Sequence, residues 1–225
     1  MNLEHIHFVE LTQLLSQDAP TWSGSCGFCL EIKKDYDQTF RVQQVKMHAG
    51  VGTHMDAPSH RFKDTPSIAD IPLEQLIVPA CLIDVSKKAH AEYVVSTHDV
   101  EENEAKFGKI PPNALVLIQT GWHRFWNDPK AYRNEMRFPA ITAAAAELLL
   151  KRDIAGIAID TLSPDCLDPT FPVHRILLGH QKYIIENMAN ASKMPPRGGY
   201  CIALPLRGEQ MSESPIRLVG LVQKT

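Results

Sequence analysis

Residues 141–160, ITAAAAELLLKRDIAGIAID, decide the class of fold. Positions 141–152 contain strong helix formers, with Thr142 near the start and two cations in the last turn, where they complement the helix dipole. Positions 154–160 form an apolar run of strand length, and a second such run, ALVLIQT, lies upstream at 114–120. Buried strands that alternate with helices are typical of parallel pairing. The stretch therefore predicts an α/β protein.

Other strands are expected on both sides of this unit. Short apolar runs and apolar–polar alternation predict them at 6–14, 38–47, 80–85, 201–208 and 215–223. A polar segment over 97–107 follows the third of these, with Thr97 as its N-cap. The chain has no internal repeat and no low-complexity linker, and 225 residues suit a single domain over 1–225.

The composition is that of a soluble globular protein. The chain is 44% hydrophobic and 22% charged, and its net charge of −3 lacks the basic footprint of a nucleic-acid binder. No stretch reaches the ~18 apolar residues of a membrane span. The N-terminus carries acids early and has no long apolar segment, so no secretory signal is expected. Together with five scattered cysteines, an odd count, this predicts a reducing, cytoplasmic location.

The densest cluster of chemically active side chains is MHAGVGTHMDAPSH, residues 47–60. His54 and Asp56 are two residues apart, so both project to one face of an extended segment. Pro58 prevents a helix there and favours a bend that can bring His60 back toward the pair. Two imidazoles and a carboxylate are suitable ligands for Zn²⁺, Mn²⁺ or Fe²⁺. The cluster therefore predicts a metal site, and the alternative is that these histidines are ordinary surface or core residues.

Other candidate sites carry less information. His174, His180 and Glu186 lie within PVHRILLGHQKYIIEN and form a second group able to bind a metal. The sequence has no G-x-S-x-G elbow, which argues against a serine nucleophile. The C-x-x-C at 26–29 precedes a segment that reads as strand rather than helix. Two inert thiols are therefore expected there, with thiol redox chemistry or a structural zinc as the alternatives.

Residues 52–60, GTHMDAPSH, resemble the H-x-G-T-H-x-D-x-P-x-H signature of the cyclase family of metal-dependent hydrolases, which includes bacterial kynurenine formamidases and isatin hydrolases. Further segments resemble the family in the same order along the chain: PTWSG at 20–24, VLIQTGW at 116–122, GIAIDTLS at 156–163, His174 followed by Glu186 and Asn187, and ALPL at 203–206. The resemblance covers nearly the whole chain. It implies an α/β fold of the swivelling β/β/α type, with mixed sheets and a few flanking helices.

The resemblance also implies roles for individual residues. His54 and Asp56 match metal ligands, with Asp56 able to bridge two ions. His60 matches the general acid/base, and it also belongs to the candidate ligands. His174 and Glu186 match the ligands that complete the side of a second metal.

Two places depart from the family pattern. The first His of the signature falls on Gly50, so one ligand is missing. His48 lies two residues earlier, about 6–7 Å along an extended strand, and is the candidate replacement. In the early loop, Trp22 matches an aromatic residue that packs on the substrate in the formamidases, whereas Ser23 and Ser25 stand where Pro and Asp are common. The identity of the substrate is therefore left open.

These parts predict a metal-dependent hydrolase that uses one or two ions of zinc or manganese. A divalent ion lowers the pKa of a bound water from ~16 toward ~7, which supplies hydroxide at neutral pH to attack an amide, formamide, lactam or ester carbonyl. His60 would carry a proton from the water to the leaving group. The alternative is a non-catalytic member of the fold that binds a small molecule through a degraded metal site, because Gly50 replaces a ligand. The expected partners are a small-molecule substrate and further copies of the chain, in a homodimer or homotetramer.

Overall fold

The computed structural model describes residues 3–166 and 168–224. Its strands, in chain order, are β1 (Ile6–Glu10), β2 (Phe28–Lys34), β3 (Val42–Met47), β4 (His54–Asp56), β5 (Ile77–Asp84), β6 (Val94–Val95), β7 (Leu115–Gln119), β8 (Ala140–Ile141), β9 (Gly156–Ile159), β10 (Tyr183–Glu186), β11 (Gly199–Pro205) and β12 (Glu213–Gln223). Its α-helices are α1 (Leu73–Leu76), α2 (Thr97–Phe107), α3 (Pro129–Arg133), α4 (Ala143–Leu150) and α5 (Pro172–Gly179).

A sheet of eight strands, in the order β1-β12-β11-β5-β7-β9-β10-β4, forms the centre of the molecule. The long strand β12 pairs antiparallel with β1, β11 and β4. Because β4 also pairs with β10, the contact between β12 and β4 closes the sheet into a barrel-like shape. Only the first three residues of β12 reach β4, so the beginning of β12 lies directly beside this short strand.

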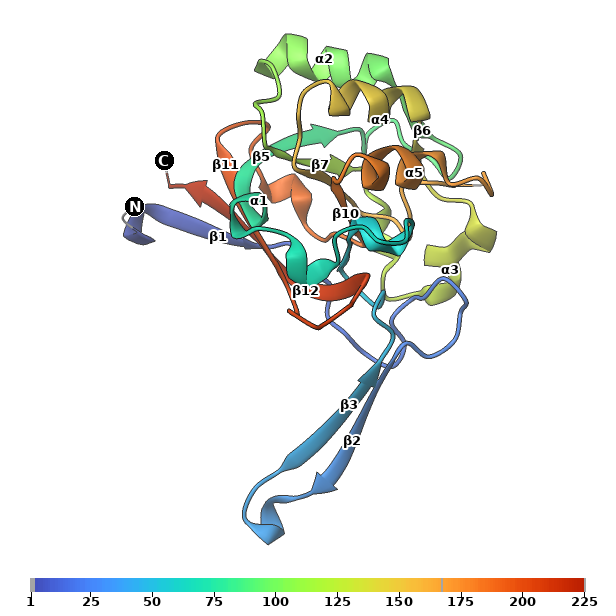
Figure 1. The fold of residues 1–225 in the computed structure, drawn as a ribbon, viewed down its shortest axis with the longest axis vertical. Helices are drawn as coiled ribbons and strands as arrows, with labels where there is room; N and C mark the ends of the chain where they lie inside the picture. Colours follow the sequence, from blue (N-terminus) through green and yellow to red (C-terminus); the bar gives the residue numbers. More distant parts are fainter. Residues whose placement is uncertain (1–2, 167, 225) are drawn as a thin grey trace.

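The parallel pairing predicted from residues 114–160 is confirmed. β5 pairs with β7, β7 with β9, and β9 with β10, all in parallel. Successive side chains of a strand point to opposite faces, so Leu115 and Leu117 belong to one core and Val116 and Ile118 to another. The second core includes buried apolar residues of α2, α4 and α5, the helices that Figure 1 shows together on one side of the sheet. The predicted α/β class, with a mixed sheet and few flanking helices, is confirmed.

Several predicted boundaries need correction. The strand expected over 6–14 ends at Glu10, and the strand expected over 38–47 begins at Val42 because residues 36–38 form a 3-10 turn. The cap of α2 is Ser96 rather than Thr97. Ser96 and Asp99 form a reciprocal capping box, in which the Asp99 carboxylate also accepts the Ser96 backbone N–H at 2.7 Å.

The hairpin of β2 and β3 projects away from the body of the molecule (Figure 1). One of its faces is apolar: Leu30 pairs across the strands with Val45, and Ile32 follows two residues later on the same face. These side chains are 40%, 49% and 49% exposed, respectively. A two-stranded ribbon is at best marginally stable in water by itself. The hairpin therefore carries an apolar surface that one copy of the described chain leaves in contact with solvent.

In the part of the chain that the structure describes, no helix combines the length and the hydropathy needed to cross a membrane. The single domain over 1–225 stays a prediction. A sheet that takes its strands from both ends of the chain is compatible with it.

Candidate metal centre

The short strand β4 carries the first two residues of the site. Its neighbours place two acids beside it: Glu186 of β10 lies opposite His54, and Glu213 of β12 lies opposite Asp56. His54 and Asp56 share one face of β4, as their spacing predicted. Pro58 begins a 3-10 turn that ends at His60, which is the predicted bend.

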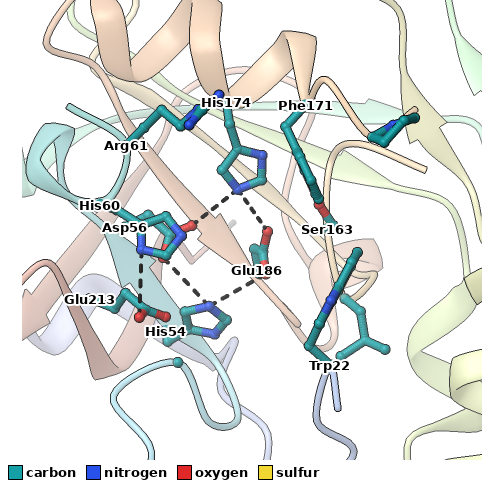
Figure 2. A pocket seen from close by; sticks show the side chains of 13 residues that line it. Trp22, His54, Asp56, His60, Arg61, Ser163, Phe171, His174, Glu186 and Glu213 are labelled. Atoms are coloured by element: carbon teal, nitrogen blue, oxygen red, sulfur yellow. Dashed lines mark ion pairs between the residues drawn. The ribbon is translucent and has the colours of Figure 1, made fainter. Parts of the chain in front are cut away.

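Two carboxylates each lie between two imidazoles. The Nε2 atom of His54 is 3.6 Å from Asp56 Oδ1 and 3.4 Å from Glu186 Oε2. The Nε2 atom of His174, which α5 supplies, is 3.5 Å from Asp56 Oδ2 and 3.4 Å from Glu186 Oε1. Figure 2 shows the two rings turned toward this pair of carboxylates. Each of these two carboxylates thus points one oxygen at His54 and the other at His174. We call the two halves of the site the His54 side and the His174 side.

The outer nitrogen of each ring is held by a different group. His54 Nδ1 donates to the backbone carbonyl of Gly52 at 2.9 Å. His174 Nδ1 donates to the carboxylate of Asp165 at 2.8 Å, and Asp165 also accepts the backbone N–H groups of Val173 and His174 in the first turn of α5. Both arrangements leave the Nε2 lone pair free to face the site, as in metal-ligating histidines.

The electrostatics of the site require positive charge. Burial by itself would lower the pKa of both rings, but the acids outweigh it. Glu186 and Asp56 raise the pKa of His54 to about 9, and Asp165, Asp56 and Glu186 raise that of His174 to about 12. Burial opposes ionisation of Asp56, yet His174 and His54 hold the pKa of its carboxyl below the ordinary value. Without a cation, two protonated imidazoles must therefore balance the buried carboxylates.

The residues present fit a divalent cation. Two ligand atoms that share a tetrahedral zinc at ~2.0–2.1 Å lie about 3.3–3.4 Å apart, close to the 3.4–3.6 Å between each ring nitrogen and its carboxylate oxygens. Asp56 is 1% exposed, and its Oδ1 has no hydrogen-bond partner within residues 3–166 and 168–224. An orphaned buried carboxylate oxygen is costly unless it binds a cation. Among the described residues, two groups meet the distance requirement for a shared ion: His54, Asp56 and Glu186, and Asp56, His60 and His174.

The site forms the floor of a cavity of about 560 Å³. One wall is aromatic, with the Trp22 and Phe171 ring centroids 5.9 Å apart. His60 and Arg61 border the cavity on the side of the 3-10 turn. A cavity of this size can hold a small aromatic molecule.

Most of the predicted site residues come together here, and two do not. His54, Asp56, His60, His174, Glu186 and Trp22 all line the cavity. His48 is exposed and belongs to neither of the two metal-competent groups found among the described residues. Its proposed position assumed an extended segment, but residues 49–50 form a turn. His180 is also exposed, and its Nδ1 donates to the backbone carbonyl of Ile176.

Sequence reasoning missed three residues of the site. Asp165 lies nine positions before His174 with no motif that connects them. Glu213 lies in a polar stretch of sequence that reads as a loop, although it is the first residue of β12. Only the register of β12 against β4 brings Glu213 to the cavity. Arg61 follows His60 directly and could have been noted from that position alone.

Comparison with known proteins assigns the family. Residues 9–166 match the model of the family described as "Putative cyclase". The chain belongs to the cyclase family. The isatin hydrolase of Roseibium aggregatum is 31% identical over 193 residues, which cover 77% of this chain and 72% of that protein. The kynurenine formamidase of Bacillus cytotoxicus is 27% identical over 220 residues, which cover 94% of this chain and 96% of that protein.

Solved structures of cyclase-family proteins extend the likeness to the fold. Isatin hydrolase A from Labrenzia aggregata, bound to benzyl benzoate, superposes with a TM-score of 0.91 at 29% identity, over 98% of this chain and 95% of that one. An isatin hydrolase bound to the product analogue thioisatinate gives a TM-score of 0.91 at 26% identity, over 98% of this chain and 94% of that one. The resemblance read from residues 52–60 is confirmed, and with it an enzyme of the hydrolase class.

Proposed function

We propose that this protein is a metal-dependent hydrolase that cleaves the C–N bond of a small amide, formamide or lactam, or the corresponding ester. The observation that carries the proposal is the pair of buried carboxylates, Asp56 and Glu186, each placed between His54 and His174 at the floor of the cavity. These four residues would hold one or two ions of zinc or manganese. A bound divalent cation would supply Lewis acidity and a lowered pKa of water.

His60 is suited to proton transfer. Its ring lines the cavity and is one-third exposed, and its Nδ1 lies 3.5 Å from Glu213 Oε1. This leaves Nε2 available to accept a proton from the attacking water and to return it to the departing nitrogen. Water thereby adds across the bond: its oxygen goes to the carbonyl carbon and a proton goes to the nitrogen. Such acid–base catalysis is typically worth roughly 10²–10⁴-fold in rate.

The cavity favours an aromatic substrate. Trp22 and Phe171 form a wall on which a planar ring can pack, and Arg61 offers a positive charge among the lining residues. The names of the relatives, isatin hydrolase and kynurenine formamidase, agree with an aryl amide or a fused lactam. We therefore propose N-formyl aryl amides and isatin-like lactams as the first substrates to assay.

The test combines turnover with metal analysis. Protein purified without a histidine tag should hydrolyse one of these substrates, lose activity after treatment with a chelator, and regain it with Mn²⁺ or Zn²⁺. The variant His60→Asn should lose roughly 10²–10⁴-fold in turnover. The control is His98→Asn, an exposed histidine on α2, which should behave as the parent protein. Full activity of His60→Asn, or of the metal-free protein, contradicts the proposal.

The second candidate function is that of a metal-free binding protein, and Gly50 is the observation that favours it, because it stands where the family signature has a ligand. Protein that takes up no Mn²⁺ or Zn²⁺ from a micromolar supply, yet binds an aryl amide without turning it over, would support this reading. The buried Oδ1 of Asp56, which has no hydrogen-bond partner among the described residues, favours the hydrolase.

We propose further that the protein is a homodimer or homotetramer, and that the hairpin of β2 and β3 packs on a second copy. The apolar face of this hairpin, with Leu30, Ile32 and Val45, supports the proposal because burial of that face would offset the marginal stability of the ribbon. Light scattering during gel filtration should give the mass of two or four chains. Ile32→Glu should lower that mass, whereas Lys46→Glu, on the polar face, should not. A parent protein of monomeric mass contradicts the assembly.

A cytoplasmic location is also proposed. None of the five cysteines forms a disulfide in the described residues, and two of them, Cys26 and Cys29, are exposed. Free exposed thiols persist in a reducing compartment.

A further inference from the structure

The space beside Gly50 is filled by another residue of the site. A Cβ atom added to Gly50 would fall on the Oε2 atom of Glu213, and it would lie 3.3 Å from His54 Nε2. Gly50 does not have the positive φ that favours glycine. The small residue is therefore not required by the backbone at this position. The space that a side chain at position 50 would occupy is instead taken by the end of the Glu213 side chain, which would have to move to admit it.

The pairing of β12 with β4 fixes Glu213 at this place. Glu213 is the first residue of β12 and lies opposite Asp56, while Pro215 lies opposite His54. The two carboxylate oxygens have different surroundings: Oε1 lies 3.5 Å from His60 Nδ1, and Oε2 faces the Gly50 side next to His54. Figure 2 shows Glu213 close to His60 and His54 at the border of the cavity.

On the His54 side, a buried carboxylate oxygen has an ion-pair partner but no hydrogen-bond partner among the described residues. Asp56 Oδ1 is the oxygen that faces His54, and it is the orphaned atom of this buried carboxylate. His54, Asp56 and Glu186 already offer atoms close enough to share one ion. Glu213 lies just outside this group among the described residues, so its carboxylate would have to turn toward the ion to add a further oxygen beside His54 Nε2.

We propose that Glu213 is a metal ligand on the His54 side, where it replaces the side chain that Gly50 lacks. This inference rests on the proposed function, because it assigns a further ligand to the same metal site. The exchange makes the donor set of the His54 side one imidazole and three carboxylates. Carboxylate oxygens suit Mn²⁺ better than they suit softer ions, so the exchange shifts the preference of this side from Zn²⁺ toward Mn²⁺.

The experiment is a titration of chelator-treated protein with MnCl₂ and, separately, with ZnCl₂, followed by calorimetry. Glu213→Ala should weaken Mn²⁺ binding at one site by at least roughly 10–100-fold, the loss seen when even the outer partners of metal ligands are removed. The matched control is Glu209→Ala, an exposed glutamate in the segment before β12, which should bind as the parent protein does.

A second variant keeps the test independent of folding defects. Gly50→His combined with Glu213→Ala removes the obstruction and supplies an imidazole, so it should restore metal binding with a higher ratio of Zn²⁺ to Mn²⁺ affinity. Gly50→His alone should bind poorly, because its side chain meets Glu213. Unchanged Mn²⁺ affinity of Glu213→Ala, in a parent protein that binds metal, overturns this inference and leaves the proposed function intact. A parent protein that binds neither metal overturns both.

Discussion

The two sides of the metal site share their carboxylates and differ in what holds their imidazoles. On the His174 side, the ring is fixed by the Asp165 carboxylate, which is itself held by the backbone at the start of α5. On the His54 side, the ring is held by a backbone carbonyl, and a glycine with a facing glutamate stands where the family signature has a histidine. The comparison shows two imidazoles held by different groups, and the proposed Glu213 ligand would lie on the His54 side alone.

The largest effect should come from a residue that serves both sides. Glu186→Ala removes the carboxylate oxygen beside His54 and the one beside His174. Metal binding should therefore weaken on both sides together. Loss of a metal that stabilises the transition state by several kcal/mol should reduce turnover by about 10³-fold or more. Metal content and turnover are measured beside Glu101→Ala, an exposed glutamate on α2. A variant that retains one tightly bound ion would show that the sides do not share Glu186.

An intermediate loss of metal affinity should be confined to the His174 side. Asp165→Asn leaves the His174 ring in place but removes the negative charge that orients it, and such changes typically cost roughly 10–100-fold in metal affinity. Calorimetric titration with Mn²⁺ should therefore show one weakened site and one unchanged site. Equal weakening of both sites would contradict the separation between the His174 side and the His54 side.

The smallest expected effect is a change in the stability of the metal-free protein with pH. The acids around His54 raise its pKa in the folded protein to about 9, from an ordinary value of 6.5. The raised pKa means that the folded state binds the proton more tightly, so this contribution to stability is complete below pH 6.5 and is lost as the pH rises through 9. The melting temperature of chelator-treated protein should fall by several degrees across this range, relative to His54→Gln. An equal pH dependence of the two proteins would contradict the assignment.

Features that depend on residues close together in the chain were predictable from the sequence, whereas features that depend on distant strands were not. The strand–helix–strand unit over 114–160 is marked by composition and by Thr142, which caps α4 by accepting the Ala145 N–H. The spacing of His54 and Asp56 placed both on one face of β4. These features depend on residues close together in the chain.

Long-range register decided the rest. Glu213 reaches the site because β12 crosses β4 at a particular residue, and a shift by one residue would turn its side chain to the other face. His48 was expected to fill the place of a missing ligand on the assumption of an extended segment, and the turn at 49–50 removes that assumption. A short motif shows where ligands are missing, but only the pairing of distant strands shows which residue stands in the gap.

The central claim is that Asp56 holds metal on both sides of the site, and the number of metal equivalents per chain tests it most directly. Untagged protein and the near-isosteric Asp56→Asn variant are loaded with Mn²⁺ or Zn²⁺ and freed of excess metal. Their bound metal is then measured by inductively coupled plasma mass spectrometry. The account predicts one or two equivalents in the parent protein and their loss in Asp56→Asn, with the melting curve confirming that the variant is folded. Equal metal content in the two proteins, or none in either, would contradict it.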